Sequence, residues 1–567
     1  MATPHASVSA QQDLGRQPQS TQWASESSTS HTTLAPDMKH EAHVDFSTKS
    51  ELGSDGLPKL QDTDVEKGGA AVTNSPPPTV PMAPALAADD PESEYLCVSA
   101  CIMNRAFAQS IAWVPAASTD PRTWAKGKKI YVNFVLCIWV LSLTYASTAY
   151  VASIRVIEAR FRITQEVAIL GVTLMVLGFA AGPLLFGPLS EVYGRRPVYV
   201  VTGLCYSAFS FGAAFADSTA SLLAFRFFMG FFGSSSINNV PASIGDFTTP
   251  LERGPYTILY ALSAFGGPSL GPLCSSYIEA RIGWRWNFRV MAIFSTVMSI
   301  LVALAPETHG PTILKAKIKR EGNAPPALTF IQAINVYKVA IKRPLLYLFT
   351  EPIVTLVSLY LAILYGILYG FFNGFIVVWM ETRHFSSTSY GLTYISLGCG
   401  FLFGCVMLAT VGVKVYNKAA AKAEAEGVPT PAESRLVLAY FGAPAVPLAL
   451  FLFAGTAPFP HIHWIVPCIA EFIFSAGMLM VFTAFIPYLF ETYMATSASA
   501  LAAGMASRAT VGAVFPLFSV QAFHGLGITG ASCLLGGVSV LLAPIPFIFR
   551  VYGPRIRAKS KYAVHVQ

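Results

Sequence analysis

The amino-acid sequence predicts an all-α polytopic membrane protein with twelve transmembrane helices in two six-helix halves. Three observations predict this fold class: the composition, the number and length of the apolar runs, and the distribution of basic residues between them. Hydrophobic residues make up 53% of the 567 residues and charged residues 12%, about half the usual charged share of a soluble domain. A chain with so few charged residues cannot cover a water-facing surface, so we expect lipid to be its solvent.

The apolar runs have the length of membrane-spanning helices. A helix needs about 20 residues to cross roughly 30 Å of hydrocarbon, and runs of that length begin near residue 130. Six runs precede a polar, basic stretch and six follow it. This layout predicts a first half at 130–305, a cytosolic linker at 306–343 and a second half at 344–549. The expected spans are 130–153, 167–187, 197–217, 220–241, 256–278, 288–305, 351–377, 390–411, 436–456, 463–487, 496–521 and 526–549.

The ends of the chain differ from the spans. Residues 1–94 are rich in Ser, Thr, Gln and Pro and carry 14 acidic against 5 basic residues. Such a segment cannot bury enough apolar area to fold, so we expect a disordered cytosolic tail. Residues 95–129 are the expected juxtamembrane segment and 550–567 a second cytosolic tail. No basic region followed by an apolar core opens the chain, so we expect the first span to direct membrane insertion.

Basic residues are distributed unevenly between the connections. With both termini in the cytosol, 23 Lys and Arg residues fall on the cytosolic side of the spans and 7 on the opposite side. This bias follows the positive-inside rule and favours an even number of spans. We therefore expect a multi-pass protein with cytosolic N- and C-termini. Of the plasma and vacuolar membranes, between which the charge bias does not distinguish, we expect the plasma membrane.

The most specific motif lies between the second and third spans, where the chain reads GPLSEVYGRR from Gly187 to Arg196. Gly187 permits close helix approach, and Gly194 can turn the chain with a positive φ. Glu191 can pair with Arg195 and Arg196 or meet a helix end. The run resembles the signature loop of the major facilitator superfamily, most strongly that of the fungal twelve-span drug:proton antiporters, which include multidrug, polyamine and toxin exporters. The resemblance implies the major facilitator fold and assigns these five residues to a conformational latch.

The resemblance extends from about Asp120 to the C-terminus. It includes Pro306-Glu307-Thr308, which ends the first half, and the run Phe515 to Phe518 in the eleventh span. A degenerate echo of the signature, Gly412 to Lys418, follows the eighth span. A parallel repeat of two six-span halves would place it there.

A Gly-Pro run in the fifth span, Gly267-Pro268 and Gly271-Pro272, kinks the helix and thins one of its faces. The run can serve tight packing, a hinge, or both. It resembles the antiporter motif that separates exporters from importers in this superfamily, and so implies export. The closing Gly-Gly of that motif is Ser275-Ser276 here.

Arg226 is a charged residue inside the fourth span. Such a residue costs about 2.5–3.5 kcal/mol on insertion scales, so it normally faces a cavity or a partner, or extends to the membrane surface. Its placement resembles the superfamily arginine associated with proton coupling. Asn238 and Asn239 follow on the same span. They can line a substrate cavity or form helix–helix hydrogen bonds.

Charges are few in the second half, and three of them are candidates for proton coupling together with Arg226. Glu351 begins the seventh span, where it can cap the helix or bind a proton. Glu471 lies deepest of the acidic residues, in the tenth span, and is the best candidate for a carboxylate that binds and releases a proton. Arg508 lies near the middle of the eleventh span as a possible counter-charge. A static Glu471–Arg508 ion pair would instead be structural.

Aromatic and amide residues of the seventh span complete the candidate substrate cavity with the two asparagines. Aromatic faces can hold a flat apolar solute or a cation, although the same rings can simply pack between helices. The candidates are Tyr360, Tyr365, Tyr369 and Asn373.

These features predict a secondary active transporter that exports a small amphipathic molecule, such as a drug, toxin or secondary metabolite, by alternating access. We expect the proton gradient to drive it without a cofactor, because the sequence contains no phosphate-binding Gly-x-x-x-x-Gly-Lys loop. We expect no metal site, no enzymatic activity and no nucleic-acid partner, and we expect a monomer. A polyamine exporter of the same fold and a non-transporting membrane sensor are the alternatives.

Overall fold

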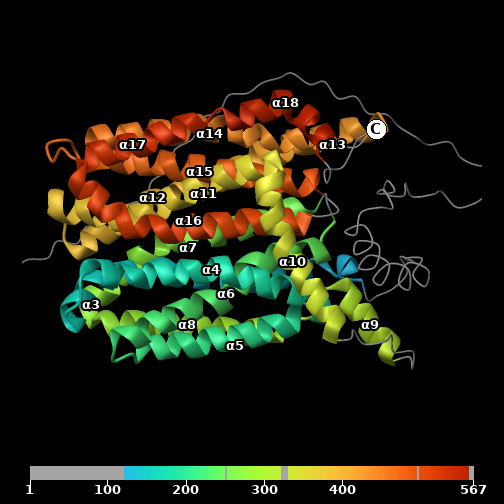
Figure 1. Cartoon of the computed structure of the whole chain (residues 1–567), viewed down its shortest axis with the longest axis horizontal. Coiled ribbons are helices and arrows are strands. Elements are labelled where there is room, and N and C mark those ends of the chain that lie inside the picture. The colour runs from blue at the N-terminus through green and yellow to red at the C-terminus, as the bar shows by residue number, and fades with distance from the viewer. Residues whose placement is uncertain (1–119, 250–251, 321–329, 429, 494–496, 561–567) are drawn as a thin grey trace, which may run out of the picture. The chain divides into compact units, whose positions relative to one another are not determined.

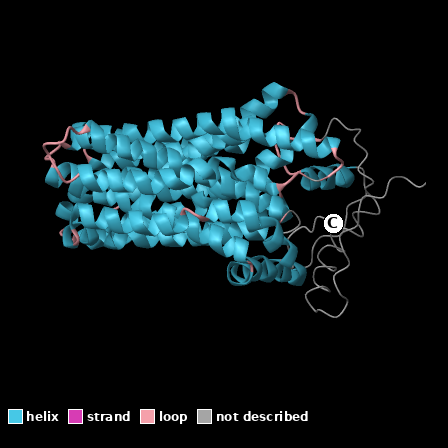
Figure 2. Ribbon diagram, turned by 90° about the horizontal axis from the view of Figure 1, so that it is seen from above, coloured by secondary structure: helices cyan, strands magenta, loops and turns pink. Residues whose placement is uncertain are grey.

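The computed structural model describes residues 120–249, 252–320, 330–428, 430–493 and 497–560. Every regular element in these residues is a helix (Figure 2). The tail predicted at 1–94 and most of the juxtamembrane segment lie outside the described residues.

The first half contains six long helices, which correspond to the first six expected spans. The first of them tightens into the 3-10 turn η2 (Tyr150–Ser153) and continues as α3 (Ile154–Phe161). The six are α2 (Lys126–Ala149), α4 (Gln165–Tyr193), α5 (Arg195–Ala214), α6 (Thr219–Phe247), α7 (Arg253–Ile282) and α8 (Trp284–Leu304).

The second half repeats this layout. The predicted linker is largely helical in the described residues, with α9 (Gly310–Arg320) and the start of α10 (Phe330–Thr350). The six long helices are α11 (Pro352–Phe375), α12 (Ser387–Met407), α14 (Val437–Thr456), α15 (Ile465–Thr492), α16 (Ser497–Gly525) and α17 (Gly527–Leu542). Shorter elements extend them: η3 (Ile376–Thr382) follows α11, η4 (Leu408–Gly412) and α13 (Val413–Ala425) follow α12, and α18 (Ile545–Lys559) follows α17.

Among the described helices, 11 are long and apolar enough to cross a membrane. Of the helices that correspond to expected spans, the one outside this set is α7, which spans 30 residues and carries the Gly-Pro run. Glycine, proline and serine lower its hydropathy, but α2 of its own half and α12 of the other half pack on it. We therefore count α7, the fifth span in chain order, together with the other 11, which gives twelve spans. The predicted fold class is confirmed.

Two helix pairs join the halves. Helix α4 packs along α16, and α7 packs along α12, so the second and fifth spans meet the eleventh and eighth (Figure 1). Glycines allow the close approaches within each half. A Cβ on Gly230 of α6 would lie 2.0 Å from the Met175 carbonyl oxygen of α4, so no larger residue fits there without a backbone shift.

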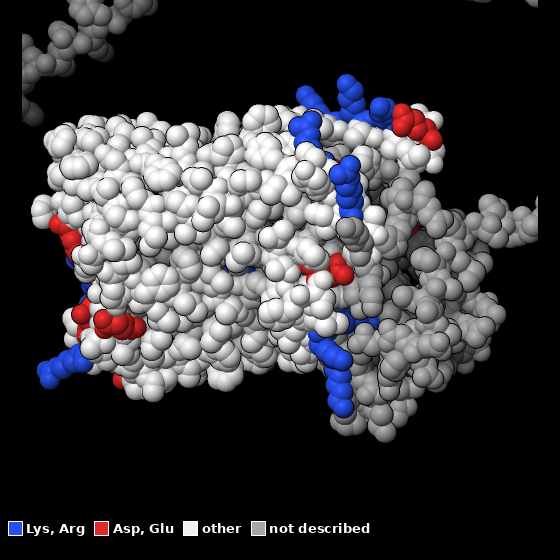
Figure 3. Space-filling model, turned by 45° about the horizontal axis from the view of Figure 1, so that its top comes forward, with Lys and Arg blue, Asp and Glu red and all other residues white. Residues whose placement is uncertain are grey.

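The surface has the charge distribution of a membrane protein. In the view of Figure 3, Lys, Arg, Asp and Glu lie near the two ends, and the surface between them is formed by other residues. Leu204, Leu448 and Leu541 are more than half exposed on the long helices, where lipid tails would cover them. We call the end at which α4 meets α5 the Gly194 end.

Most spans begin or end a few residues from their predicted bounds, and two of these differences change the expected layout. Helix α4 runs through Gly187 and Glu191 to Tyr193, so the connection expected at 188–196 is reduced to Gly194 with its φ of 100°. The twelfth span is interrupted rather than continuous: α17 ends at Leu542, Pro544 follows, and α18 continues the same candidate span, which runs from Gly527 to Ala558. Proline lacks the N–H that a continuous helix would need at this point. Much of the expected C-terminal tail is therefore helical.

Candidate functional site

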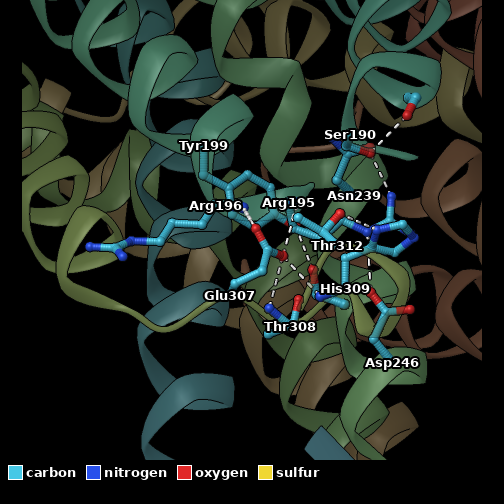
Figure 4. Close-up of polar contacts among 12 residues, drawn as sticks. Ser190, Arg195, Arg196, Tyr199, Asn239, Asp246, Glu307, Thr308, His309 and Thr312 are labelled. Carbon is cyan, nitrogen blue, oxygen red and sulfur yellow. Dashed lines mark hydrogen bonds and ion pairs between the residues drawn. The ribbon is translucent and has the colours of Figure 1, made fainter. Parts of the chain in front are cut away.

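A charged network surrounds Gly194 (Figure 4). The Glu307 carboxylate, in the connection between α8 and α9, accepts hydrogen bonds from the backbone N–H groups of Arg195 (3.0 Å) and Arg196 (2.9 Å). It also accepts from the N–H groups of Thr308 and His309 at 2.9 and 2.8 Å. The first N–H groups of a helix have no partner within it, and the helix dipole favours an anion there. Glu307 therefore caps α5 from a residue 111 positions away in sequence.

The two signature arginines have partners outside the signature. Arg195 forms an ion pair with Asp246 of α6 at 3.2 Å and donates to the Ser190 hydroxyl. Arg196 donates to the Ala303 carbonyl oxygen at 3.0 Å. Glu191 forms no ion pair within 4.0 Å among the described residues, so its predicted pairing with the arginines is not seen. This charged network, which contains residues of the expected latch and is called the latch network below, joins α4, α5, α6 and the end of α8 to Glu307 and His309 at the start of the linker.

His309 belongs to this network and lies outside the spans. Its Nδ1 lies 2.8 Å from the Thr312 hydroxyl. Burial, with help from the positive charges of Arg195 and Lys315, lowers the pKa of His309 from 6.5 to about 4. The imidazole is therefore neutral near pH 7, and its contact with Thr312 is a hydrogen bond.

This shift predicts an acid-sensitive latch. Between pH 6.5 and about 4 the unfolded chain binds a proton that folded His309 does not, so protonation favours unfolding in that window. The contribution of neutral His309 is fully present above pH 6.5 and lost as the pH falls to about 4. We expect the Tm of the purified protein to fall less between pH 7 and pH 4.5 in His309→Asn than in the natural chain.

The matched control for this experiment is His461→Asn, because His461 is exposed at the other end of the bundle. It should keep the pH dependence of the natural chain. Equal losses of Tm in the natural chain and His309→Asn would contradict the assignment.

Arg226 is fully buried, so it does not extend to the membrane surface. Its guanidinium donates to the carbonyl oxygens of Gly171 (2.9 Å), Ala146 (2.8 Å) and Ser147 (3.2 Å). It also lies 4.7 Å from the centroid of the Tyr150 ring. The last two carbonyls belong to the turn in which α2 tightens into η2. Arg226 thus connects α6 to α2 and α4 without a carboxylate partner within 4.0 Å among the described residues.

Glu471 is buried in α15 and receives two hydrogen bonds within the second half. Trp379 Nε1 of η3 donates at 3.1 Å, and the Ser396 hydroxyl of α12 donates to the other carboxylate oxygen. Arg508 is not a partner, so the static ion pair considered from the sequence does not form. Among the described residues no cationic group lies within 4.0 Å of Glu471, and the two groups that donate to its carboxylate are neutral.

Glu351 precedes α11, but its side chain does not cap that helix. The carboxylate accepts instead from the Tyr493 hydroxyl at 2.8 Å and the Ser560 hydroxyl at 2.7 Å. The capping role predicted from Glu351-Pro352 is therefore replaced by a tie between α11, the end of α15 and the end of α18. Ser560 could not be foreseen, because it lies 209 residues away in sequence.

The aromatic candidates of α11 fall into two groups. Tyr369 lies 3.1 Å from the Ser147 hydroxyl of α2, so it joins the halves. Its ring centroid lies 4.9 Å from that of Tyr365. Tyr360 packs edge-on against Phe485 within the second half, 5.8 Å between centroids.

The amide candidates also separate. Asn373 is fully buried, and its two amide atoms have no hydrogen-bond partner among the described residues. Asn239 donates to the Phe186 carbonyl oxygen of α4 at 3.2 Å, and Asn238 donates to Asn239 at 3.1 Å. Asn239 therefore forms a helix–helix hydrogen bond, one of the two roles left open by the sequence, whereas Asn238 bonds within α6.

The Gly-Pro run of α7 lies against α2. A Cβ on Gly267 would lie 2.0 Å from the Thr144 hydroxyl, and one on Gly271 2.2 Å from the Thr148 hydroxyl. The Pro268 carbonyl would normally bond the N–H of residue 272, which is also proline and has none. The Thr148 hydroxyl donates to this carbonyl at 3.1 Å.

Polar contacts hold the halves together at both ends of the bundle. Opposite the Gly194 end, Arg155 of α3 pairs with Glu381 of η3 at 2.8 Å, and Gln521 of α16 donates to Glu166 of α4 at 3.2 Å. At the Gly194 end, the Arg253 guanidinium lies 5.7 Å from the Phe490 ring centroid. Sequence reasoning missed these residues, because surface charges near span ends carry no local signal of their partners.

A family model described as the Major Facilitator Superfamily matches residues 134–516. The chain belongs to the major facilitator superfamily. Efflux pump FUB11 of Gibberella moniliformis is 38% identical over 78% of this chain and 74% of that protein. The major facilitator superfamily multidrug transporter mdrA of Aspergillus fumigatus is 36% identical over 80% of this chain and 76% of that protein. Multidrug transporter TPO1_2 of Candida glabrata is 35% identical over 79% of this chain and 78% of that protein.

Solved structures support the same fold. The proton:xylose symporter XylE covers 76% of this chain and 96% of its own with a TM-score of 0.56 at 17% identity. A peptide transporter POT covers 78% of this chain and 98% of its own with a TM-score of 0.55 at 16% identity. The family suggested by the Gly187–Arg196 signature is confirmed. The chain is a multi-pass membrane transporter of this superfamily.

Proposed function

We propose that this major facilitator protein is a proton-driven exporter of small amphipathic organic molecules. The similarity to proteins named as efflux pumps and multidrug transporters carries this proposal, because it extends over 78–80% of the chain and includes both halves. The Gly-Pro run of α7 agrees with export.

Alternating access would proceed by rocking of one half against the other. Opening opposite the Gly194 end would separate Arg155 from Glu381, Gln521 from Glu166, and Ser147 from Tyr369. Opening at the Gly194 end would separate α7 from α12 and Arg253 from Phe490. The latch network lies within the first half and the start of the linker and would keep α4, α5 and α6 together as one rigid unit during both movements.

Glu471 is the proposed proton carrier. A buried carboxylate without a cationic partner favours the protonated form, and a proton would convert it from an acceptor of two hydrogen bonds into a donor. Its neighbours come from η3, α12 and α15, so a proton would alter contacts among three elements of the second half. Because α12 also packs on α7, that change can reach the boundary between the halves.

The proposed orientation has the Gly194 end and both termini in the cytosol of a monomer in the plasma membrane. The 23-to-7 distribution of basic residues supports this orientation. A polyamine exporter is less well supported, because a polycation needs several carboxylates in its cavity and Glu471 is the one deep candidate. A non-transporting sensor would bind ligands without net flux.

Transport by the purified chain in proteoliposomes tests the proposal. An imposed pH gradient, acidic on the receiving side, should drive accumulation of a fluorescent amphipathic dye. Dissipation of the gradient with a protonophore should stop it. Transport that persists unchanged after dissipation would overturn proton coupling, and binding without flux would support the sensor.

A further inference from the structure

Arg508 is an intramembrane cation whose donors lack a strong acceptor. It lies near the middle of the 29-residue helix α16. Among the described residues, no Asp or Glu lies within 4.0 Å of its guanidinium. Nε and Nη2 are directed at the Met505 sulfur, at 3.0 and 2.6 Å. A thioether is a weak acceptor, so a permanent positive charge in this environment remains poorly compensated.

The other arginine within the membrane shows what compensation looks like. Arg226 directs three nitrogens at three backbone carbonyl oxygens and is fully buried. In the part of the chain that the structure describes, no backbone carbonyl oxygen accepts from Arg508, which is half-buried. Both arginines lie in spans of the same chain, so the difference in charge compensation comes from the strong acceptors that surround Arg226 and that Arg508 lacks among the described residues.

The surroundings of Arg508 are aromatic and lie at the boundary between the halves. Its guanidinium carbon is 5.7 Å from the ring centroids of both Tyr365 in α11 and Phe482 in α15. Phe265 of α7, in the first half, packs edge-on against Phe482 with 5.1 Å between centroids. Arg508 therefore lies where α7 meets the second half, and movement of the halves would expose it.

We infer that Arg508 is the anion-binding group of the substrate site and that the substrates are amphipathic organic anions. The predicted ligand carries a carboxylate on a flat apolar ring system. The carboxylate would accept the paired N–H groups that now meet Met505, and the ring would pack against Tyr365 and Phe482. This inference rests on the proposed transport function, and it specifies the class of molecule transported.

The same geometry disfavours two other roles. A polyamine would bring further positive charge next to a fixed cation in a medium of low dielectric constant, where repulsion is strong. Arginine also keeps its proton under all conditions of transport, so Arg508 does not carry the coupled proton. It was predicted as a proton-coupling candidate, and we assign it instead to the substrate.

Matched ligands of one ring system test the inference on the full-length protein in detergent, without a pH gradient. The probes are 1-naphthoate, the neutral 1-naphthamide and the cationic 1-naphthylmethylamine, measured by calorimetry and by the shift in Tm. We expect naphthoate to bind about tenfold or more tighter than the amide and to raise the Tm of the natural chain. Arg508→Gln should remove this preference, and Arg508→Lys should retain part of it.

The natural chain, Arg508→Gln and the exposed-residue control Arg160→Gln should all fold. We expect Arg508→Gln without ligand to be at least as thermostable as the natural chain, because it removes an uncompensated charge. Absence of naphthoate binding, equal naphthoate affinity in Arg508→Gln, or tighter binding of the amine would each overturn the inference. Because binding is measured without a pH gradient, a failure of proton coupling in the transport assay would not affect the measured preference for naphthoate. Likewise, a failure to bind naphthoate would not affect the test of proton coupling.

Discussion

Replacement of Glu471 by glutamine should abolish gradient-driven transport while leaving substrate exchange active. Glutamine has nearly the same shape: its carbonyl oxygen can accept from Trp379 and its amide N–H can donate to the Ser396 hydroxyl, but it cannot bind or release a proton. If Glu471 carries the coupled proton, the variant should lose the proton transfer that the pH gradient drives but keep the conformational change that carries substrate. We expect accumulation against a gradient to fall by about tenfold or more, with equilibrium exchange of substrate preserved.

Proteoliposomes measured with and without an imposed pH gradient separate the two activities. Glu426→Gln is a matched control, because Glu426 is exposed on the connection after α13 and should transport like the natural chain. Full gradient-driven accumulation by Glu471→Gln would remove Glu471 from the coupling mechanism. Loss of both activities would instead indicate a structural role.

Truncation of Arg226 to alanine should destabilise the first half more than any other single charge removal. It removes the three hydrogen bonds from the charged guanidinium to the Gly171, Ala146 and Ser147 carbonyl oxygens, and a hydrogen bond to a charged group is worth about 1.5–3 kcal/mol. It also leaves a void beside the Tyr150 ring, where the guanidinium now packs. We expect a loss of several kcal/mol in the free energy of unfolding, with a Tm lower by many degrees.

Thermal unfolding in detergent measures this loss. Arg226→Lys should recover part of the stability, since an ammonium can reach some of the carbonyl oxygens. Arg160→Ala, at an exposed position on α3, should leave the Tm unchanged. A Tm of Arg226→Ala equal to that of the natural chain would show that the three hydrogen bonds contribute nothing measurable to stability.

Some of the site could be predicted from local sequence. The Gly187–Arg196 signature identified the superfamily, because a short run of glycines and charges between two apolar spans is informative without its partners. Arg226 and Glu471 were identified as unusual because charged residues inside spans are costly and rare. The close approach of α7 to a neighbouring helix was one predicted consequence of Gly267 and Gly271.

The partners of these residues could not be predicted. Arg195 pairs with Asp246 rather than Glu191, and Glu351 meets Tyr493 and Ser560 rather than capping α11. Glu471 meets Trp379 and Ser396 rather than Arg508. In each case the sequence suggested a partner of suitable charge or the adjacent helix end. The tertiary packing brought a residue of another helix to that position, and this residue became the partner.

By itself the sequence determined that the chain is helical, crosses the membrane twelve times in two halves and carries the superfamily signature. These properties follow from hydropathy and from short motifs, which act over a few residues and need no knowledge of packing. Only the tertiary structure decided which charges are compensated. In the sequence, Arg226 and Arg508 are both charged residues within apolar spans. In the structure, carbonyl oxygens surround Arg226, whereas the thioether of Met505 and two aromatic rings surround Arg508. That difference depends on how α2, α4, α11 and α15 pack around them, and it decides which arginine holds the fold together and which is left for a ligand.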